Sequence, residues 1–119
     1  VAEQPYAEGF GDRADVTLSE DDQTLIKAMR QRVDTLIVVQ LSGRPLIISD
    51  VLDEADAWVC AWWPGTEGGN GILDGLCGDA PFTGKLSYDI PRSSDQLPRS
   101  RIVDDGETPL FAYGHGLTL

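Results

Sequence analysis

Apolar residues recur at helical spacing in the first third of the chain. The recurring positions are Leu25, Ile26, Met29 and Val33, and this period predicts an amphipathic helix over residues 19–33. Ser19 is a favoured N-cap residue, and residues 20–22 are acidic, which suits the positive end of the helix dipole. The helix is therefore expected to begin directly after Ser19.

Two continuous apolar runs follow this helix. Residues 35–41 are mostly β-branched, a composition typical of a strand buried on both faces in a parallel sheet. Residues 57–62 are also continuously apolar, and they predict a second buried strand. Between the two runs, residues 46–48 predict a short strand and residues 51–55 a short helix.

In the second half of the chain the predicted helices and strands are shorter. Residues 71–76 predict a short helix that ends at Gly78, and residues 84–88 predict an edge strand. After Pro91 the chain is rich in Pro, Ser, Arg and Asp and is expected to wrap the surface. Alternation of strands and helices predicts an α/β class domain, a layered α/β sandwich with a mostly parallel sheet.

The length and net charge of the chain argue against some classes of binding partner. The chain has 119 residues, enough for one domain or part of one, with 9 basic and 20 acidic residues and a formal net charge of −11. A basic surface for nucleic acid is therefore not expected, and anionic membranes are disfavoured for the same reason. No stretch approaches the roughly 20 apolar residues of a membrane helix.

The sequence offers little for a metal or a cofactor. Cys60 and Cys77 lack a metal-type spacing and have no neighbouring Cys or His cluster. Cys60 lies in an apolar run and is expected to behave as a small buried hydrophobe, with both thiols reduced. The glycines of residues 65–71 do not have the spacing of a dinucleotide-binding loop. No cofactor is therefore expected.

The first residues resemble the end of a strand that runs into a loop. Val1 and Ala2 are apolar, and Gln4 and Pro5 soon follow. The buried strand predicted at residues 35–41 also needs neighbours on both sides. We therefore expect another polypeptide segment to contribute strands to the same sheet.

Five segments together resemble the C-terminal domain of glycoside hydrolase family 3. They are residues 3–12 (EQPYAEGFGD), 41–46 (LSGRPL), 57–68 (AWVCAWWPGTEG), 78–86 (GDAPFTGKL) and 109–117 (PLFAYGHGL). Each is weak alone, but all five occur in the family's order and cover nearly the whole chain. The likeness is closest to exo-acting glucan glucohydrolases of plants and bacteria. One departure is Ala2, where relatives commonly have glycine.

The resemblance implies that residues 1–119 are the C-terminal part of the family's α/β sandwich domain. In the family, a barrel domain supplies the carboxylate nucleophile and a loop of the sandwich supplies the general acid/base. The chain would then belong to a retaining, exo-acting β-glucosidase or β-glucan glucohydrolase, and it is expected to be inactive when isolated. The barrel domain and the first strands of the sandwich would lie outside it.

The resemblance also implies partners and a location. The partners are the remainder of the same enzyme and a β-glucoside or β-glucan oligosaccharide. Family members are often secreted or periplasmic, which is the expected location. Two alternatives remain: a non-catalytic domain that docks on and stabilises the barrel, and a free-standing module that binds carbohydrate.

The first loop contains the candidate catalytic carboxylates. Retaining glycosidases use two carboxyl groups roughly 5–5.5 Å apart, and the candidates in this loop are Glu3, Glu8 and Asp12. The family motif places the acid/base at Glu8, with Tyr6 and Phe10 as expected apolar cover. Glu3 is the alternative acid, or else a brace for the loop backbone. Tyr6, Glu3 and Trp63 are the substrate-binding candidates.

Other residues favour structural interpretations. Arg44 is expected to tie loops together beside a strand end. Trp58 and Trp62 are spaced for core packing, whereas Trp63 lies at the strand exit. Glu67 is expected to cap the helix that follows it. His115, the single histidine, is expected to have a structural role near the C-terminus.

Overall fold

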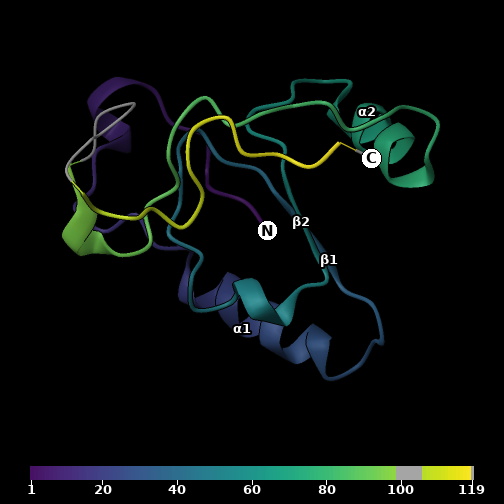
Figure 1. Cartoon of the computed structure of the whole chain (residues 1–119), viewed down its shortest axis with the longest axis horizontal. Helices are drawn as coiled ribbons and strands as arrows, with labels where there is room; N and C mark the ends of the chain where they lie inside the picture. The colour runs from purple at the N-terminus through teal and green to yellow at the C-terminus, as the bar shows by residue number, and fades with distance from the viewer. Residues whose placement is uncertain (99–105, 119) are drawn as a thin grey trace.

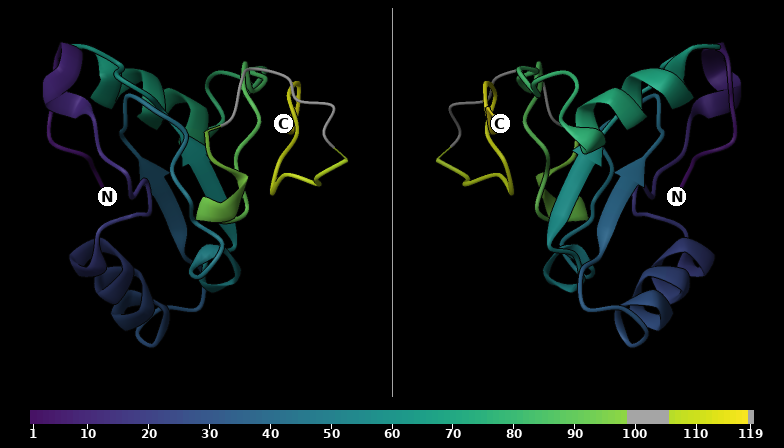
Figure 2. Two further views of the ribbon diagram at one scale, coloured as in Figure 1. Left: turned by 90° about the vertical axis from the view of Figure 1, so that its left-hand side faces the viewer. Right: turned by 90° about the vertical axis from the view of Figure 1, so that its right-hand side faces the viewer.

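The computed structural model describes residues 1–98 and 106–118 (Figure 1). The element order is η1 (Glu8–Gly11), α1 (Glu20–Arg30), β1 (Ile37–Gln40), η2 (Leu52–Glu54), β2 (Ala57–Cys60), α2 (Gly68–Cys77) and η3 (Ser94–Gln96), where η marks a short 3₁₀ turn. The expected α/β class is confirmed, and helix α2 lies beyond the carboxyl ends of the two strands, with α1 nearer their other end (Figure 2).

The two predicted buried strands pair in parallel. Strand β1 pairs with β2 in a register that runs from Ile37 opposite Ala57 to Gln40 opposite Cys60. Both strands are shorter than the apolar runs that predicted them. Residues 1–3 lie on the other edge of β1, where Ala2 forms a parallel bridge with Leu41. The backbone of the β1 segment therefore pairs with β2 on one edge and with residues 1–3 on the other, as in an interior strand of a parallel sheet.

Helix α1 follows the predicted pattern closely at its start. The Ser19 hydroxyl accepts a hydrogen bond from the Asp22 N–H, which satisfies one free donor of the first turn. The helix ends at Arg30, three residues before the predicted end. Val33 lies beyond the helix and is 37% exposed, so it does not belong to the face of α1 that packs on the core.

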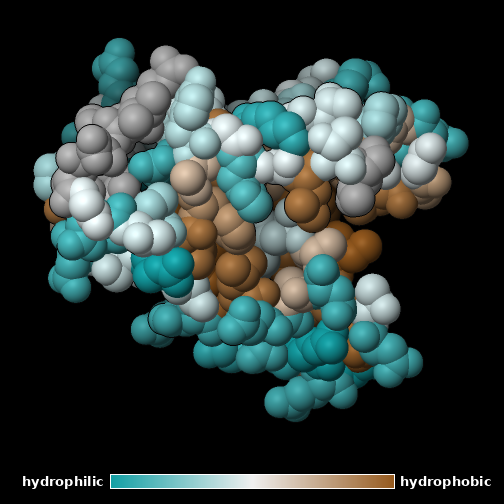
Figure 3. Space-filling view, viewed as in Figure 1, coloured by the Kyte–Doolittle hydropathy of each residue, from teal (hydrophilic) through white to brown (hydrophobic). Residues whose placement is uncertain are grey.

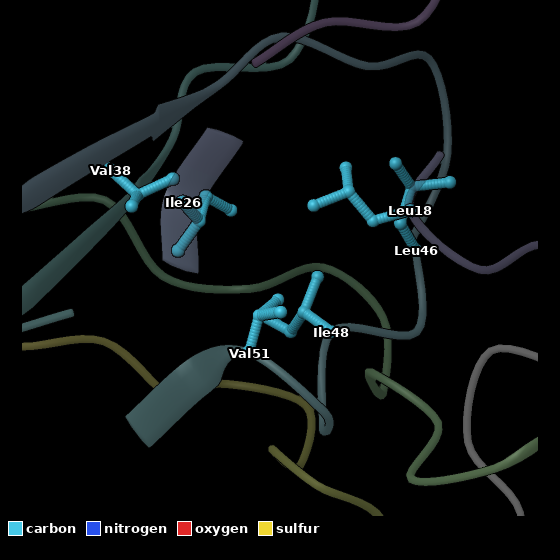
Figure 4. Packing of buried hydrophobic residues seen from close by; sticks show 6 residues of the cluster. All are labelled: Leu18, Ile26, Val38, Leu46, Ile48 and Val51. Atoms are coloured by element: carbon cyan, nitrogen blue, oxygen red, sulfur yellow. The ribbon is translucent and has the colours of Figure 1, made fainter. Parts of the chain in front are cut away.

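The hydrophobic core lies between α1 and β1. Its buried members are Leu18, Ile26, Val38, Leu46, Ile48 and Val51, shown in Figure 4. The strand predicted at residues 46–48 is wrong: all three residues are buried, but a single bridge joins Ile47 to Thr17. Residues 51–55 form the short turn η2 and not an α-helix. Burial with pairing at one residue only explains why this apolar run resembles a strand but is not one.

Helix α2 begins earlier than predicted and ends where predicted. It starts at Gly68, and Gly78 at its C-terminus has a φ of 84°, the left-handed conformation that glycine adopts readily. The edge strand predicted at residues 84–88 is wrong. That stretch is irregular: Leu86 exchanges backbone hydrogen bonds with Gly114 and His115, but the bridge nearby is the antiparallel one between Ile90 and Phe111. Within the segment predicted to wrap the surface, residues 99–105 lie outside the described residues.

An apolar hollow of about 1020 Å³ opens on one face of the molecule. Its lining includes Ile37, Trp58, Val59, Phe82 and Phe111. Figure 3 shows apolar side chains gathered in a recess between α1 and the segments opposite it. Among the described residues, no helix is both long and apolar enough to cross a membrane.

Candidate active site

The loop between Ala2 and Arg13 is attached to the sheet at its base. The Glu3 N–H donates to the Leu41 carbonyl oxygen at 2.9 Å, so the loop leaves directly from the edge of the sheet. Its outer part is the 3₁₀ turn η1, Glu8–Gly11. Residues 42–44, which follow β1, and Trp63, which follows β2, contact this loop. The loop therefore lies beyond the carboxyl ends of both strands, where α/β sheets commonly place their sites.

Glu3 is buried and surrounded by donors. Its side chain is 8% exposed, and its Oε1 atom lies 3.2 Å from Arg13 and 3.2 Å from Arg44. The Gly43 N–H donates to Oε2 at 3.3 Å. Both carboxylate oxygens are thus engaged within the loop and its neighbours. These contacts agree with the bracing alternative for Glu3, whereas its candidacy for substrate binding stays a prediction.

Arg44 is the centre of these contacts. Its Nε donates to the Tyr6 hydroxyl at 2.9 Å, and one terminal nitrogen donates to the Gly11 carbonyl. The guanidinium carbon also lies 4.2 Å from the centre of the Tyr6 ring. Arg44 therefore contacts the loop at three points, residues 3, 6 and 11, and the prediction that it ties loops together is confirmed.

Aromatic packing fixes the same region. The Tyr6 and Trp63 rings meet edge to face, with centroids 6.1 Å apart. A Cβ at Gly43 would approach the Tyr6 hydroxyl to 2.6 Å and the Trp63 ring more closely still. A Cβ at Gly11 would lie 2.6 Å from Cε2 of Tyr6. Both glycines are therefore required by close packing around Tyr6.

Glu8 occupies a different environment from Glu3. It begins η1, its side chain is exposed, and its φ is 50°, a region that few non-glycine residues occupy. Phe10 is 97% exposed, so the expectation that it shields Glu8 is wrong in this structure. Glu8 therefore lies on the outer part of a loop whose inner side is anchored. Asp12, the third carboxylate considered, is also exposed.

Trp58 lies where its spacing predicted, but Trp62 does not: it lines the apolar hollow and is not part of the core cluster. Trp58 packs against the hydrophobic core, and Trp62 is half-buried. Trp63 is 44% exposed and is the tryptophan placed beside the candidate loop. His115 stacks on Phe111 with ring centroids 4.6 Å apart, which agrees with a structural role near the C-terminus.

The capping role expected for Glu67 is wrong. Glu67 occupies the N-cap position of α2, but its side chain makes no capping hydrogen bond. Its carboxylate instead accepts from the Asn70 side chain at 3.0 Å. Its φ of −90° and ψ of 6° differ from the extended conformation typical of an N-cap.

Both cysteines are free, as expected. Cys60 is half-buried, and burial raises the pKa of its thiol above the ordinary value of 9.0. Cys77 is exposed. In the part of the chain that the structure describes, no three Cys, His, Asp or Glu side chains are grouped to hold a metal ion.

Sequence reasoning missed a buried polar chain behind Arg44. Trp58 Nε1 donates to Gln40 Oε1 at 3.0 Å, and Gln40 Nε2 donates to the Ser42 hydroxyl at 2.8 Å. That hydroxyl donates to the Arg44 carbonyl oxygen at 2.9 Å. Gln40 and Ser42 are 3% and 1% exposed. The available signal was a glutamine at the end of an otherwise apolar run.

Comparison with known proteins identifies the family. The glycosyl hydrolase family 3 C-terminal domain matches residues 1–119. The periplasmic beta-glucosidase of Salmonella typhimurium is 33% identical over 97% of this chain, which covers 18% of that relative. The xylan 1,4-beta-xylosidase of Xylanibacter ruminicola is 33% identical over 93% of this chain and is covered over 14% of its length.

Solved structures agree with this result. The exo-1,3/1,4-beta-glucanase of a Pseudoalteromonas species has a TM-score of 0.85 and 39% identity, and the match covers 98% of this chain and 16% of that one. The beta-glucosidase of Listeria innocua supports the fold, with a TM-score of 0.88 at 24% identity over 99% of this chain and 20% of that one. The chain thus spans about a fifth or less of these relatives' length, and it belongs to the glycosyl hydrolase family 3 C-terminal domain family.

Proposed function

We propose that residues 1–119 are part of a retaining, exo-acting β-glucosidase or β-glucan glucohydrolase, with Glu8 as its general acid/base. The observation that carries this assignment is the contrast between two glutamates on one loop. Glu3 is 8% exposed and engaged by two arginines, whereas Glu8 is exposed at the start of η1. Relatives named as a beta-glucosidase and an exo-beta-glucanase support the substrate class.

The proposed reaction has two steps. Glu8 in its protonated form gives its proton to the departing glycosidic oxygen, while a carboxylate elsewhere in the enzyme attacks the sugar and forms a glycosyl-enzyme. Glu8, now a carboxylate, then removes a proton from water, and the water oxygen displaces the enzyme carboxylate. Glu8 ends protonated again, so protons balance over the cycle.

The other candidate residues have supporting roles in this proposal. Trp63 presents an exposed ring beside the loop and is a candidate surface for stacking on a sugar. Tyr6 is half-buried, and its hydroxyl accepts from Arg44, so the O–H remains able to donate to a sugar hydroxyl. Glu3 acts on substrate indirectly, by holding the loop.

The proposed partner is the remainder of the same enzyme. The apolar hollow of about 1020 Å³ exposes the faces of Trp58, Val59 and Phe111, and large contiguous apolar surfaces of this kind mark contact sites. We assign this face to other segments of the α/β sandwich, and the exposed end of η1 to the barrel domain. A secreted or periplasmic location is part of the proposal, supported by the relative named as periplasmic.

The test compares substrates that differ in leaving group. In the complete enzyme, Glu8→Ala should lose activity on cellobiose by ~10²–10⁴-fold, because its leaving group needs protonation. The glycosylation step with a dinitrophenyl β-glucoside should change far less, since that leaving group departs as the anion. Glu8→Gln, which preserves shape, should behave in the same way.

Glu3→Ala and Glu20→Gln are the comparison variants. Glu20 is exposed on α1, so its replacement should leave the ratio of the two activities at the wild-type value. The assignment fails if Glu3→Ala shows the leaving-group dependence while Glu8→Ala stays near wild type. If neither variant shows it, the acid/base role proposed for Glu8 is wrong, and the alternative of a non-catalytic domain is favoured once Asp12→Ala also keeps the wild-type ratio.

A further inference from the structure

We propose that a buried hydrogen-bonded column, running from Trp58 through Gln40 and Ser42 to Arg44, positions the loop that carries Glu8. Arg44 is then a positioning residue for the acid/base step, and this inference rests on the proposed function of Glu8. Trp58, Gln40 and Ser42, which lie within or beside the sheet, would then act on the reaction through Arg44.

The column has a consistent direction. Each member donates to the next: indole N–H to amide oxygen, amide N–H to hydroxyl, and hydroxyl to the Arg44 carbonyl, over distances of 3.0, 2.8 and 2.9 Å. The Arg44 guanidinium, which can only donate, continues the direction outward to the loop. Hydrogen bonds in such a chain polarise and strengthen one another when they are shielded from water.

Burial makes the column rigid. Gln40 and Ser42 are almost inaccessible to solvent, so breaking any one bond would leave a buried polar group without a partner. Trp58 belongs to β2 and Gln40 to β1, and the parallel pairing of these strands fixes their separation. The backbone of Arg44 is therefore held relative to the sheet, and its side chain transmits that position.

Arg44 holds the outer part of the loop on either side of Glu8, at Tyr6 and at Gly11. A hollow of about 470 Å³ lies beneath it, lined by Tyr6, Gly11, Leu18 and Arg44 among others. The loop is consequently held above this hollow by contacts at Glu3, Tyr6 and Gly11, and Arg44 makes all three. Glu8 lies between Tyr6 and Gly11 in the chain, so these two contacts bracket it.

This geometry predicts a specific kinetic effect. If the loop shifts, Glu8 loses alignment with the glycosidic oxygen, and a misplacement of ~1 Å can cost ~10²-fold in rate. Proton donation suffers, but attack by the nucleophile does not. A residue that merely stabilises the domain would instead lower activity on every substrate by the same factor.

The experiment measures the ratio of kcat/KM for a dinitrophenyl β-glucoside to kcat/KM for cellobiose in the complete enzyme. Arg44→Lys keeps a positive charge near Glu3, but a single ammonium cannot reproduce the planar fork that reaches Tyr6 and Gly11. We expect this ratio to rise ~10–100-fold. Ser42→Ala and Tyr6→Phe interrupt the column and its outer end, and each should raise the ratio in the same direction.

Arg32→Lys is the matched control, because Arg32 is exposed after α1 and should leave the ratio unchanged. If Glu8→Ala raises the ratio but Arg44→Lys leaves it within about twofold of wild type, the positioning role is refuted while the function of Glu8 stands. If Glu8→Ala itself leaves the ratio unchanged, both proposals fail. If Arg44→Lys does not fold, Ser42→Ala and Tyr6→Phe decide by the same criterion.

Discussion

Replacing Gly11 with alanine should damage the candidate site through a single added methyl group. A Cβ at this position would lie 2.6 Å from Cε2 and 2.7 Å from Cγ of Tyr6. Carbon atoms in contact prefer separations of about 3.5–4.0 Å, so the ring must recede by about 1 Å. The Tyr6 hydroxyl, now 2.9 Å from Arg44 Nε, would then leave hydrogen-bonding range.

The magnitude follows from these displacements. Overpacking of a close contact costs about 1–3 kcal/mol, and the lost hydrogen bond to a charged donor adds about 1–2 kcal/mol. We therefore expect Gly11→Ala to lower the free energy of unfolding by about 2–4 kcal/mol. Because the loop carrying Glu8 moves with Tyr6, activity on cellobiose should fall by ~10²-fold beyond any loss of folded enzyme.

The assay combines thermal unfolding of the complete enzyme with kinetics on cellobiose and a dinitrophenyl β-glucoside. Gly71→Ala is the control, because a Cβ there meets nothing within 4 Å and the position lies inside α2. Alanine in a helix interior should add about 0.5–1 kcal/mol of stability. Wild-type stability and kinetics in Gly11→Ala would refute the packing described around Tyr6.

Two further predictions concern titratable groups. Burial raises the pKa of Cys60, so its thiolate should be scarce near neutral pH, and iodoacetamide should label exposed Cys77 first; equal labelling rates in peptide mass spectra would contradict this. The pKa of Asp56 is lowered below its ordinary value of 3.8, first by the Leu36 N–H and then by Arg30. Asp56 therefore stabilises the fold above its unfolded pKa, and this contribution is lost as pH falls through the lowered folded value. Asp56→Asn should reduce the melting temperature at neutral pH but have little effect well below pH 3.8, whereas a pH-independent difference would show that the carboxylate charge is not involved.

The sequence predicted elements well where local chemistry and burial agree. Ser19 and the acidic residues after it fixed the start of α1, and Gly78 fixed the end of α2, because capping depends on adjacent residues. The two apolar runs predicted β1 and β2. Residues 46–48 failed because apolar composition reports burial, whereas a strand also needs a partner along its length.

Some contacts of the candidate site were predicted from the sequence, and others were not. The tie made by Arg44 is confirmed, and the contacts of Glu3 agree with its bracing alternative. The exposure of Phe10 and the column behind Arg44 could not be foreseen, because both depend on contacts between segments far apart in the chain. Gln40 is buried against Trp58, 18 residues away, and no local pattern specifies that partner. Glu8 stands as a proposal that chemistry must test.

Rescue of Glu8→Ala by azide tests the central assignment most directly. Without its general base, the variant should accumulate glycosyl-enzyme from a dinitrophenyl β-glucoside and turn over slowly. Azide needs no deprotonation to attack, so it should restore turnover, and NMR of the product should show a glucosyl azide of β configuration. Wild-type enzyme should give glucose alone. If Glu8→Ala forms no glycosyl azide, or forms the α anomer, Glu8 is not the general acid/base of a retaining enzyme.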